Sequence, residues 1–295
     1  MLVDVAVQSY KKPESLIYTL LTLKEHSGDH IGTVWIDDDR SGDDSYEVIM
    51  NSGFVEMMKP ITVNMRVNKK GGGLYYFNKR ALLHRPGNAF WYVYYLLRGR
   101  HPAVLQEDDI RYQWAINNTR SRCLYITHDD VEFRGDIIGR YLPEMEKGYT
   151  IVGDLGQCWR CGLKEVCTPA KICAGEYPDS RWPLTSVFDL KQKRNCRINE
   201  WSCMIDVPTA KRLAAEKALF FGAREDLGDI AAYWFGHIVT HGYRFTDPVT
   251  DGREAYYEHG WQGFAGNDTD IHGGENRYDA EMIRERIADR FGLRL

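Results

Sequence analysis

The spacing of apolar and polar residues in the first 70 positions predicts alternating strands and helices. The stretch Leu2–Val7 alternates and is rich in β-branched residues, which is typical of a strand. After a polar break, apolar side chains recur at helical spacing from Glu14 to His26. A second short strand is expected at Thr33–Ile36 and a third at Ile61–Val67. This order of elements predicts an α/β fold.

The same alternation continues through the rest of the chain. A helix expected at Asp109–Thr119 leads into a strand at Cys123–Thr127. Three further elements are expected beyond residue 200: a strand near Ser202–Val207, a helix from Thr209 to Leu219, and a terminal helix from Ala280 to Phe291. Another helix is expected to open at Glu225-Asp226, with one apolar face formed by Leu227, Ile230, Ala231, Trp234 and Ile238.

Composition narrows the class of protein. A chain of 295 residues with 43% apolar residues can bury a large core within one domain. Lys plus Arg (38) nearly balances Asp plus Glu (42), which argues against a nucleic-acid surface. No stretch approaches the roughly 20 apolar residues of a membrane span, and the first residues lack a signal-peptide pattern. We therefore expect a cytoplasmic protein with no transmembrane segment, and peripheral membrane contact stays open.

Acidic residues follow two of the expected strands directly. Asp37-Asp38-Asp39 comes after the second strand, and His128-Asp129-Asp130 comes after the strand at Cys123–Thr127. Open α/β sheets bind ligands at the carboxyl ends of their strands. Carboxylates of the first cluster could accept hydrogen bonds from a nucleoside's base and ribose; the alternative is a polar turn.

The second cluster has the ligand types of a divalent-cation site. Mg²⁺ or Mn²⁺ that bridges two phosphates needs one or two carboxylates and leaves its other positions to phosphate oxygens and water. Alternate side chains of an extended segment point the same way, so His128 and Asp130 could face the ion together, with Asp129 turned toward the sugar or ribose. The alternative is that one aspartate caps a helix.

A third acidic pair, Glu225-Asp226, opens a predicted amphipathic helix. A carboxylate there could act as a general base toward an acceptor hydroxyl. The alternative is a helix start stabilised by the helix dipole. Two roles also remain open for Arg111, which could contact a phosphate or pair with Asp108 at the surface.

The order of these clusters resembles that of the family 2 glycosyltransferases. The segments that carry the resemblance are Val5–Pro13, Trp35–Asp43, Tyr125–Val131, and Glu225–Asp229 together with His241–Arg244. They correspond to the opening strand and loop, the second strand, the DxD region, and the ED helix with the strand entry after it. The resemblance covers roughly residues 3–245.

The resemblance implies an inverting transferase with the GT-A fold, a Rossmann-like nucleotide-binding sheet with flanking helices. Carried over residue by residue, Ser9 and Asp38 would contact the nucleotide, Asp130 would hold the metal, and Asp226 would deprotonate the acceptor. Glu225 and Asp129 would join the donor-binding residues. His128 stands where the family has the first acid of DxD. A late histidine commonly completes the metal shell in GT-A enzymes, and His259 and His272 are the candidates.

Five of the seven cysteines fall between Cys158 and Cys196, which requires a local explanation. A CxxC step brings two thiolates close together, and four thiolates can hold Zn²⁺ tetrahedrally. The proposed ligands are Cys158, Cys161, Cys167 and Cys196, with Cys173 as the competitor for the third place. Unligated thiols and an iron–sulfur cluster are the alternatives. Cys123 and Cys203 lie within strand patterns and are expected in the core.

These observations favour one GT-A domain over residues 1–295, with a small Cys-rich, zinc-stapled insertion at 156–200 and an acceptor-side extension at 246–295. The expected reaction moves a sugar from a UDP-, GDP- or dTDP-sugar to a glycan or lipid-linked glycan, in surface glycan or polysaccharide synthesis, assisted by Mn²⁺ or Mg²⁺. Two rival functions are a sugar-phosphate nucleotidyltransferase and a non-enzymatic zinc-stapled binding module. The first would need a glycine-rich loop after the first strand, and residues 8–13 contain no glycine.

Overall fold

The computed structural model describes residues 1–69, 76–84, 86–99, 103–155, 198–223, 230–260 and 278–295. Its centre is a seven-stranded sheet with the strand order β10-β8-β9-β6-β1-β2-β3. The strands are β1 (Val3–Ser9), β2 (Ile31–Asp38), β3 (Thr62–Val67), β6 (Cys123–Thr127), β8 (Ile151–Gly153), β9 (Ser202–Asp206) and β10 (Phe245–Thr246). Of these seven, only β9 runs antiparallel to its neighbours.

The two central strands are covered on both faces of the sheet. Every residue of β1 and of β6 is buried, as is usual for parallel strands with helices on both faces. Apart from Asp4 in β1, which accepts hydrogen bonds from Trp35, Thr119 and Ser121, their most polar residues lie at the carboxyl ends, where Gln8 and Ser9 end β1 and Thr127 ends β6. These polar side chains therefore lie together at the carboxyl edge of the sheet, where its parallel strands end.

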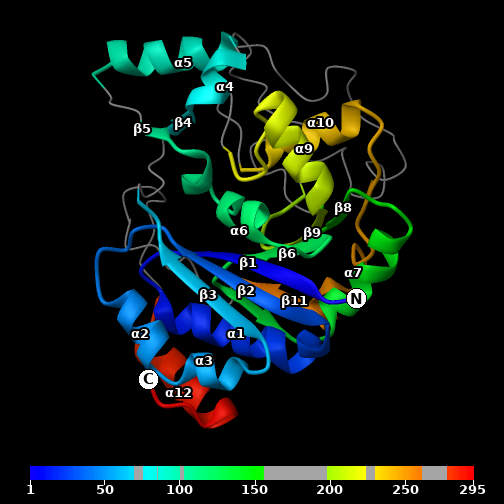
Figure 1. The fold of residues 1–295 in the computed structure, drawn as a ribbon. Coiled ribbons are helices and arrows are strands. Elements are labelled where there is room, and N and C mark those ends of the chain that lie inside the picture. The colour runs from blue at the N-terminus through cyan, green and yellow to red at the C-terminus, as the bar shows by residue number, and fades with distance from the viewer. Residues whose placement is uncertain (70–75, 85, 100–102, 156–197, 224–229, 261–277) are drawn as a thin grey trace.

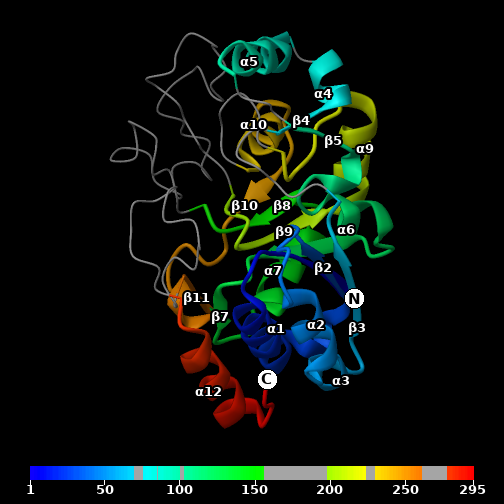
Figure 2. The same ribbon diagram turned by 90° about the vertical axis from the view of Figure 1, so that its left-hand side faces the viewer.

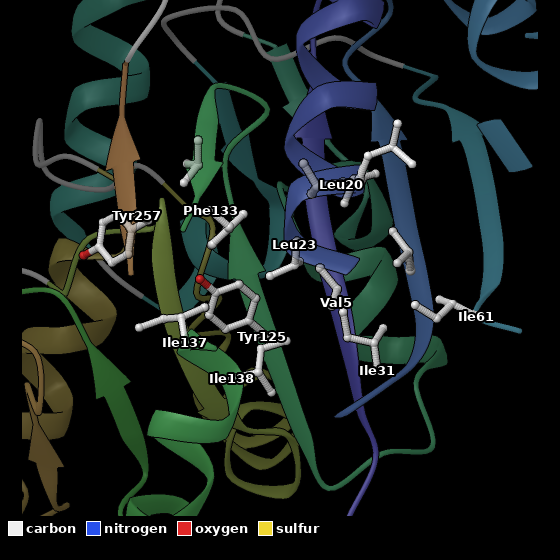
Figure 3. Packing of buried hydrophobic residues seen from close by; sticks show 14 of the residues in the cluster. Val5, Leu20, Leu23, Ile31, Ile61, Tyr125, Phe133, Ile137, Ile138 and Tyr257 are labelled. Carbon is white, nitrogen blue, oxygen red and sulfur yellow. The ribbon is translucent and has the colours of Figure 1, made fainter. Parts of the chain in front are cut away.

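One face of the sheet is covered by helices from both ends of the chain (Figures 1 and 2). They are α1 (Pro13–Ser27), α2 (Ser45–Asn51), α3 (Phe54–Met58), α7 (Ile137–Glu146) and α12 (Ala280–Phe291). Figure 3 shows Leu20 and Leu23 of α1 packed near Val5 of β1, with Tyr125 of β6 beside them. The terminal helix packs on α1, so the carboxyl-terminal segment folds back on the first crossover helix.

The opposite face is covered by α6 (Gln113–Asn118), α9 (Val207–Lys217) and α10 (Ala232–Thr240) (Figure 1). Ile116, Leu213 and Trp234 from these three helices belong to one buried cluster with Leu124 and Ile126 of β6. The two layers of helices together hold the sheet edge in place, because its strands contact a packed core on each side.

Two small strand pairs lie outside the central sheet. The strands β7 (Val131–Phe133) and β11 (Tyr257–His259) pair antiparallel. The strands β4 (Tyr76–Asn78) and β5 (Ala103–Leu105) pair parallel, with α4 (Lys79–His84) and α5 (Pro86–Leu97) between them. Three short 3-10 turns complete the described elements: η1 (Gly28–His30), η2 (Glu107–Asp109) and η3 (Arg253–Ala255). Among the described helices, none combines the length and apolar character needed to cross a bilayer.

The strands at the start of the chain and the terminal helix Ala280–Phe291 confirm the prediction from the sequence. One helix start is wrong, and one predicted helix is interrupted. The helix expected from Asp109 begins at Gln113, because Tyr112 adopts a left-handed φ of 64° and a separate 3-10 turn precedes it. The described part of the helix expected from Glu225 begins at Ala232, after Ala231 at φ 63°. Glu225 and Asp226 themselves lie outside the described residues.

Candidate active site at the carboxyl edge of the sheet

The polar ends of three neighbouring strands meet at one edge of the sheet. In the parallel pairing of β1 with β2, Gln8 lies beside Asp37 and Ser9 beside Asp38. On the other side of β1, Val7 lies beside Thr127, the residue before His128. The backbone N–H of Asp39 donates to the Ser9 carbonyl at 2.8 Å, so the β2 turn is tied to the end of β1.

His128, Asp130 and His259 form the one group of possible metal ligands found in the described part of the chain. One donor atom from each lies within 4.8 Å of the others. Asp130 Oδ1 is 3.7 Å from His128 Nδ1 and 3.5 Å from His259 Nε2. This oxygen is buried and makes no hydrogen bond in the described structure. A buried carboxylate oxygen without a partner, facing two imidazoles, fits a bound cation.

The backbone of the small sheet delivers His259 to this group. His259 pairs with Val131 across β11 and β7, and the N–H of Gly260 donates to the Asp130 carbonyl at 2.9 Å. The Trp201 indole stacks on the His259 ring, with centroids 4.2 Å apart and an interplanar angle of 13°.

Asp154 holds the surroundings of His259 in place. It is buried and accepts hydrogen bonds from Trp201 Nε1 at 2.9 Å and from the Tyr257 hydroxyl at 2.7 Å. Arg253 pairs with both carboxylate oxygens at 2.8 and 2.9 Å. One buried carboxylate therefore fixes the ring that covers His259 and the strand that carries it.

His128 is held between two carboxylates. Its Nε2 lies 3.1 Å from Glu200 Oε1, and Asp130 lies on its other side. Burial disfavours the imidazolium, but the two acids outweigh burial and raise the pKa of His128 to about 9. Burial likewise disfavours the ionised form of Asp130, yet Lys12 and the two histidines hold the pKa of that carboxyl well below its usual range.

Lys12 brings a positive charge to the same edge from the loop before α1. Its Nζ lies 3.0 Å from Asp129 Oδ1 and 3.9 Å from Asp130 Oδ2. Burial opposes this charge, but the two aspartates more than compensate and raise the pKa of Lys12. Asp129 also accepts a weak hydrogen bond from the Tyr10 N–H at 3.4 Å.

The first acidic cluster divides into three environments. Asp37 receives two hydrogen bonds from Arg66, at 2.9 and 3.0 Å. Asp38 is buried, and its two oxygens accept from the N–H and the hydroxyl of Ser41 at 2.8 and 2.6 Å, so its carboxylate shapes the turn. Asp39 is buried, and Arg111 lies 3.8 Å from it. Arg111 therefore pairs with Asp39. The surface pair with Asp108, one of the two roles left open by the sequence, is not formed among the described residues.

Several buried polar atoms near this edge make no hydrogen bond within the described residues. They are both amide atoms of Gln8, the hydroxyls of Ser9 and Tyr112, and Asp130 Oδ1. Buried polar groups in folded proteins are nearly always hydrogen-bonded, so a cluster of exceptions indicates a site whose partner is a ligand.

The structure brings together Ser9, Asp38, His128, Asp129 and Asp130 at one edge, and it places His259, one of the two late histidines that the sequence offered, beside His128 and Asp130. His272, Glu225, Asp226 and the cysteines Cys158, Cys161, Cys167, Cys173 and Cys196 lie outside the described residues. Cys123 and Cys203 are buried, as predicted.

Three residues of the site, Lys12, Glu200 and Trp201, were not predicted from the sequence. Lys12 sits in the segment that resembles the family's first loop, so its position offered a signal. Glu200 and Trp201 carry no local motif, because they reach the site only through the pairing of β9 with β6.

No protein-family model and no curated protein sequence matches this chain. Among solved structures, it matches the mannosyltransferase PcManGT from Pyrobaculum calidifontis, solved in complex with GDP-Man and Mn²⁺. That match has a TM-score of 0.52 and 12% identity, over 83% of this chain and 54% of the other. TarS 1–349 from S. aureus matches with a TM-score of 0.45 and 12% identity, over 87% and 60% of the two chains, and is too distant to support an argument. The chain spans about half the length of the mannosyltransferase structure, and the likeness shows a GT-A-like fold.

Proposed function

We propose that this chain is a glycosyltransferase that moves a sugar from a nucleoside-diphosphate sugar to an acceptor hydroxyl, assisted by a divalent cation. The observation that carries the proposal is the group His128, Asp130 and His259 beside Lys12, at the carboxyl edge of a GT-A-like sheet. A cation and a half-buried ammonium within reach of one another are suited to a ligand with two adjacent phosphates.

The donor atoms favour Mn²⁺ over Mg²⁺. Mg²⁺ prefers oxygen ligands, whereas two imidazoles and one carboxylate suit borderline ions. When bound, such an ion would neutralise negative charge that develops on the departing diphosphate. PcManGT was solved with GDP-Man and Mn²⁺, so this pair is the first that we would test.

The chain's own residues then have distinct roles. Asp130, His128 and His259 would hold the ion, and His128 would release its proton on binding, because only a neutral imidazole ligates a metal. Lys12 would turn from Asp129 toward a phosphate oxygen, because a half-buried ammonium gains most from the nearest strong anion. Ser9, and the turn that Asp38 shapes, would border the nucleotide.

The acceptor side of the proposal rests on the family resemblance. Asp226 would take the proton of the acceptor hydroxyl as it attacks the sugar carbon that bears the diphosphate, with Glu225 beside the donor. This displacement inverts the configuration at that carbon. Glycans and lipid-linked glycans are the proposed acceptors, in surface glycan synthesis, and residues 246–295 would border them.

A structural Zn²⁺ held by Cys158, Cys161, Cys167 and Cys196 is a separate proposal. Metal analysis of the purified protein should find one zinc per chain, and Cys158→Ser should lose it. Zinc retained by that variant, or found in no preparation, would exclude this ligand set. Cys203→Ser is the matched control, because Cys203 is buried in the core.

The function is tested by incubating the protein with GDP-Man, UDP-glucose or dTDP-glucose and Mn²⁺, and measuring free nucleoside diphosphate with and without glycan acceptors. Release that needs Mn²⁺ and falls at least 100-fold in Asp130→Asn supports the proposal. A nucleotidyltransferase would instead release pyrophosphate from a nucleoside triphosphate and a sugar phosphate. A binding module would raise its melting temperature with ligand and release no product.

A further inference from the structure

The helix α5 has an apolar surface on both of its sides. Asn88, Trp91 and Tyr95 are buried, and Trp91 and Tyr95 pack with Phe77 of β4. On the opposite side, Phe90, Val93 and Leu97 recur at positions i, i+3 and i+7, and their side chains are 50%, 52% and 82% exposed. A helix that is apolar all round normally has a covering on every side.

These exposed side chains are concentrated in one place. Nine large apolar residues are exposed in the described part of the chain, and five of them lie on α4 and α5: Leu83, Phe90, Val93, Leu96 and Leu97. Figures 1 and 2 show α5 at one end of the molecule, at the opposite end from α12. The outer face of α5 is therefore available to a large partner.

The charge of the surrounding sequence identifies the chemistry of that partner. Between Glu56 and Glu107 the chain has no acidic residue, although its net charge is −4. The same stretch carries nine cationic residues: Lys59, Arg66, Lys69, Lys70, Lys79, Arg80, Arg85, Arg98 and Arg100. Three of them, Lys59, Arg66 and Arg80, form ion pairs with Glu56, Asp37 and Glu107. Next to the helix, Lys79 and Arg98 are exposed, and neither has an ion pair with another described residue.

We propose that the outer face of α5 docks on an anionic lipid surface, with Phe90, Val93 and Leu97 inserted at the headgroup level. An interfacial helix combines an apolar face of this kind with flanking Lys and Arg residues. Tyr92 and Tyr94 are half-buried beside this face, and tyrosine suits the boundary between headgroups and acyl chains. A second copy of this chain fits less well, because it would bring two strongly cationic segments together.

Binding is tested with the whole protein by co-sedimentation with vesicles. Vesicles of phosphatidylcholine with 30% phosphatidylglycerol are compared with phosphatidylcholine alone, at about 0.05 and 0.5 M NaCl. We expect the protein to bind the anionic vesicles, and high salt to weaken binding because it screens surface charge. Failure to bind anionic vesicles, or equal binding to both kinds, would overturn the proposal.

Two variant pairs separate the apolar and the cationic contributions. Phe90→Ser with Leu97→Ser should weaken binding about ten-fold or more, and Leu2→Ser, an exposed apolar residue at the amino terminus, should not. Lys79→Gln should weaken it about five-fold, and Arg98→Gln by a similar factor. Arg294→Gln, at the end of the chain near α12, is the charge control. All of these side chains are exposed, so the melting temperatures should match the wild type.

Light scattering provides the competing outcome. The competing outcome has three parts: the protein dimerises, Phe90→Ser with Leu97→Ser makes it monomeric, and no vesicle binding is seen. The outer face of α5 would then be a dimer interface, and the lipid proposal would be wrong. If Lys79→Gln and Arg98→Gln bind anionic vesicles as tightly as the wild type, the proposal is also excluded. This holds even if the variant with Phe90→Ser and Leu97→Ser fails to fold. Neither outcome depends on glycosyl transfer, so this test is separate from that of the proposed function.

Discussion

The Trp201 indole lies flat against the His259 imidazole, with ring centroids 4.2 Å apart, and its Nε1 donates to the buried carboxylate of Asp154. Asp154 also binds Tyr257, two residues before His259 on the same strand. The ring orientation of the proposed ligand is thus fixed through a residue that does not face the ion. Such supporting contacts commonly change metal affinity 10- to 100-fold.

Trp201→Ala should therefore weaken Mn²⁺ binding by about ten-fold or more. It should also lower the free energy of unfolding by about 3–5 kcal/mol, because a large buried side chain is lost. Trp201→Phe is the matched control, since it keeps an aromatic ring against His259 and loses the bond to Asp154. Calorimetric titration with Mn²⁺ measures the change, and equal affinity in folded Trp201→Ala would refute a role for the stacking.

Neighbouring aspartates allow a sharp test of the proposed metal site. Asp130→Asn should reduce Mn²⁺ affinity about 100-fold, whereas Asp129→Asn should change it only a few-fold, because Asp129 faces Lys12. With Mn²⁺ at about 100 times Kd, the wild type gains about 2.7 kcal/mol of stability, and Asp130→Asn should gain about 0.4 kcal/mol. Urea unfolding with and without Mn²⁺ gives both values. A larger loss in Asp129→Asn would move the ion to the other carboxylate.

Much of the central sheet could be predicted from the sequence, because the apolar runs and the polar residues that end them are local features. The β-branched run at the start of the chain located β1, apolar strands that stop at acidic residues located β2 and β6, and the helix after Asp279 was predicted within its observed bounds. The strands β7 and β11 could not be predicted, because three residues carry little periodicity and their pairing joins Val131 to His259 across the chain.

Backbone conformation explains the other errors. Tyr112 and Ala231 adopt left-handed φ angles, which non-glycine residues rarely do, so neither helix start had a sequence signal. In the candidate site, too, only residues with a local signal in the sequence could be predicted. Residues next to a strand end were found from their motifs, whereas Glu200 and Trp201 depend on strand order, which one sequence does not give.

Asp37 should make the stability of the protein depend on pH. Burial raises the pKa of Asp37 to about 7, although Arg66 acts in the opposite direction. An unfolded aspartate has a pKa near 3.8, so between about pH 4 and 7 the folded state binds the proton more tightly. The contribution of Asp37 to stability is therefore present below about pH 4 and is lost as pH rises toward 7.

The comparison that isolates this group is the wild type against Asp37→Asn, which cannot titrate. The wild type should lose stability relative to the variant by up to about 1.4 kcal/mol per pH unit between pH 5 and 7. Urea unfolding at half-unit intervals measures the difference. A flat difference would mean that the pair with Arg66 keeps Asp37 ionised throughout.

Gly222 should be intolerant of any side chain, because a Cβ there would overlap the carbonyl oxygen of Arg111, with which Gly222 forms a β-bridge. The residues on either side of Arg111 and of Gly222 are buried, so neither backbone can shift freely, and Gly222→Ala should cost about 1–3 kcal/mol. Gly28→Ala is the matched control: its φ is −57°, and its Cβ would meet only the flexible Lys24 side chain, at 3.3 Å. That variant should be neutral or slightly stabilising.

Because Arg111 lies beside Asp39 at the sheet edge, Gly222→Ala should also weaken nucleotide binding several-fold at temperatures where it remains folded, and Gly28→Ala should not. A shift in melting temperature on adding GDP measures this, and equal shifts in the two variants would separate Arg111 from the donor site.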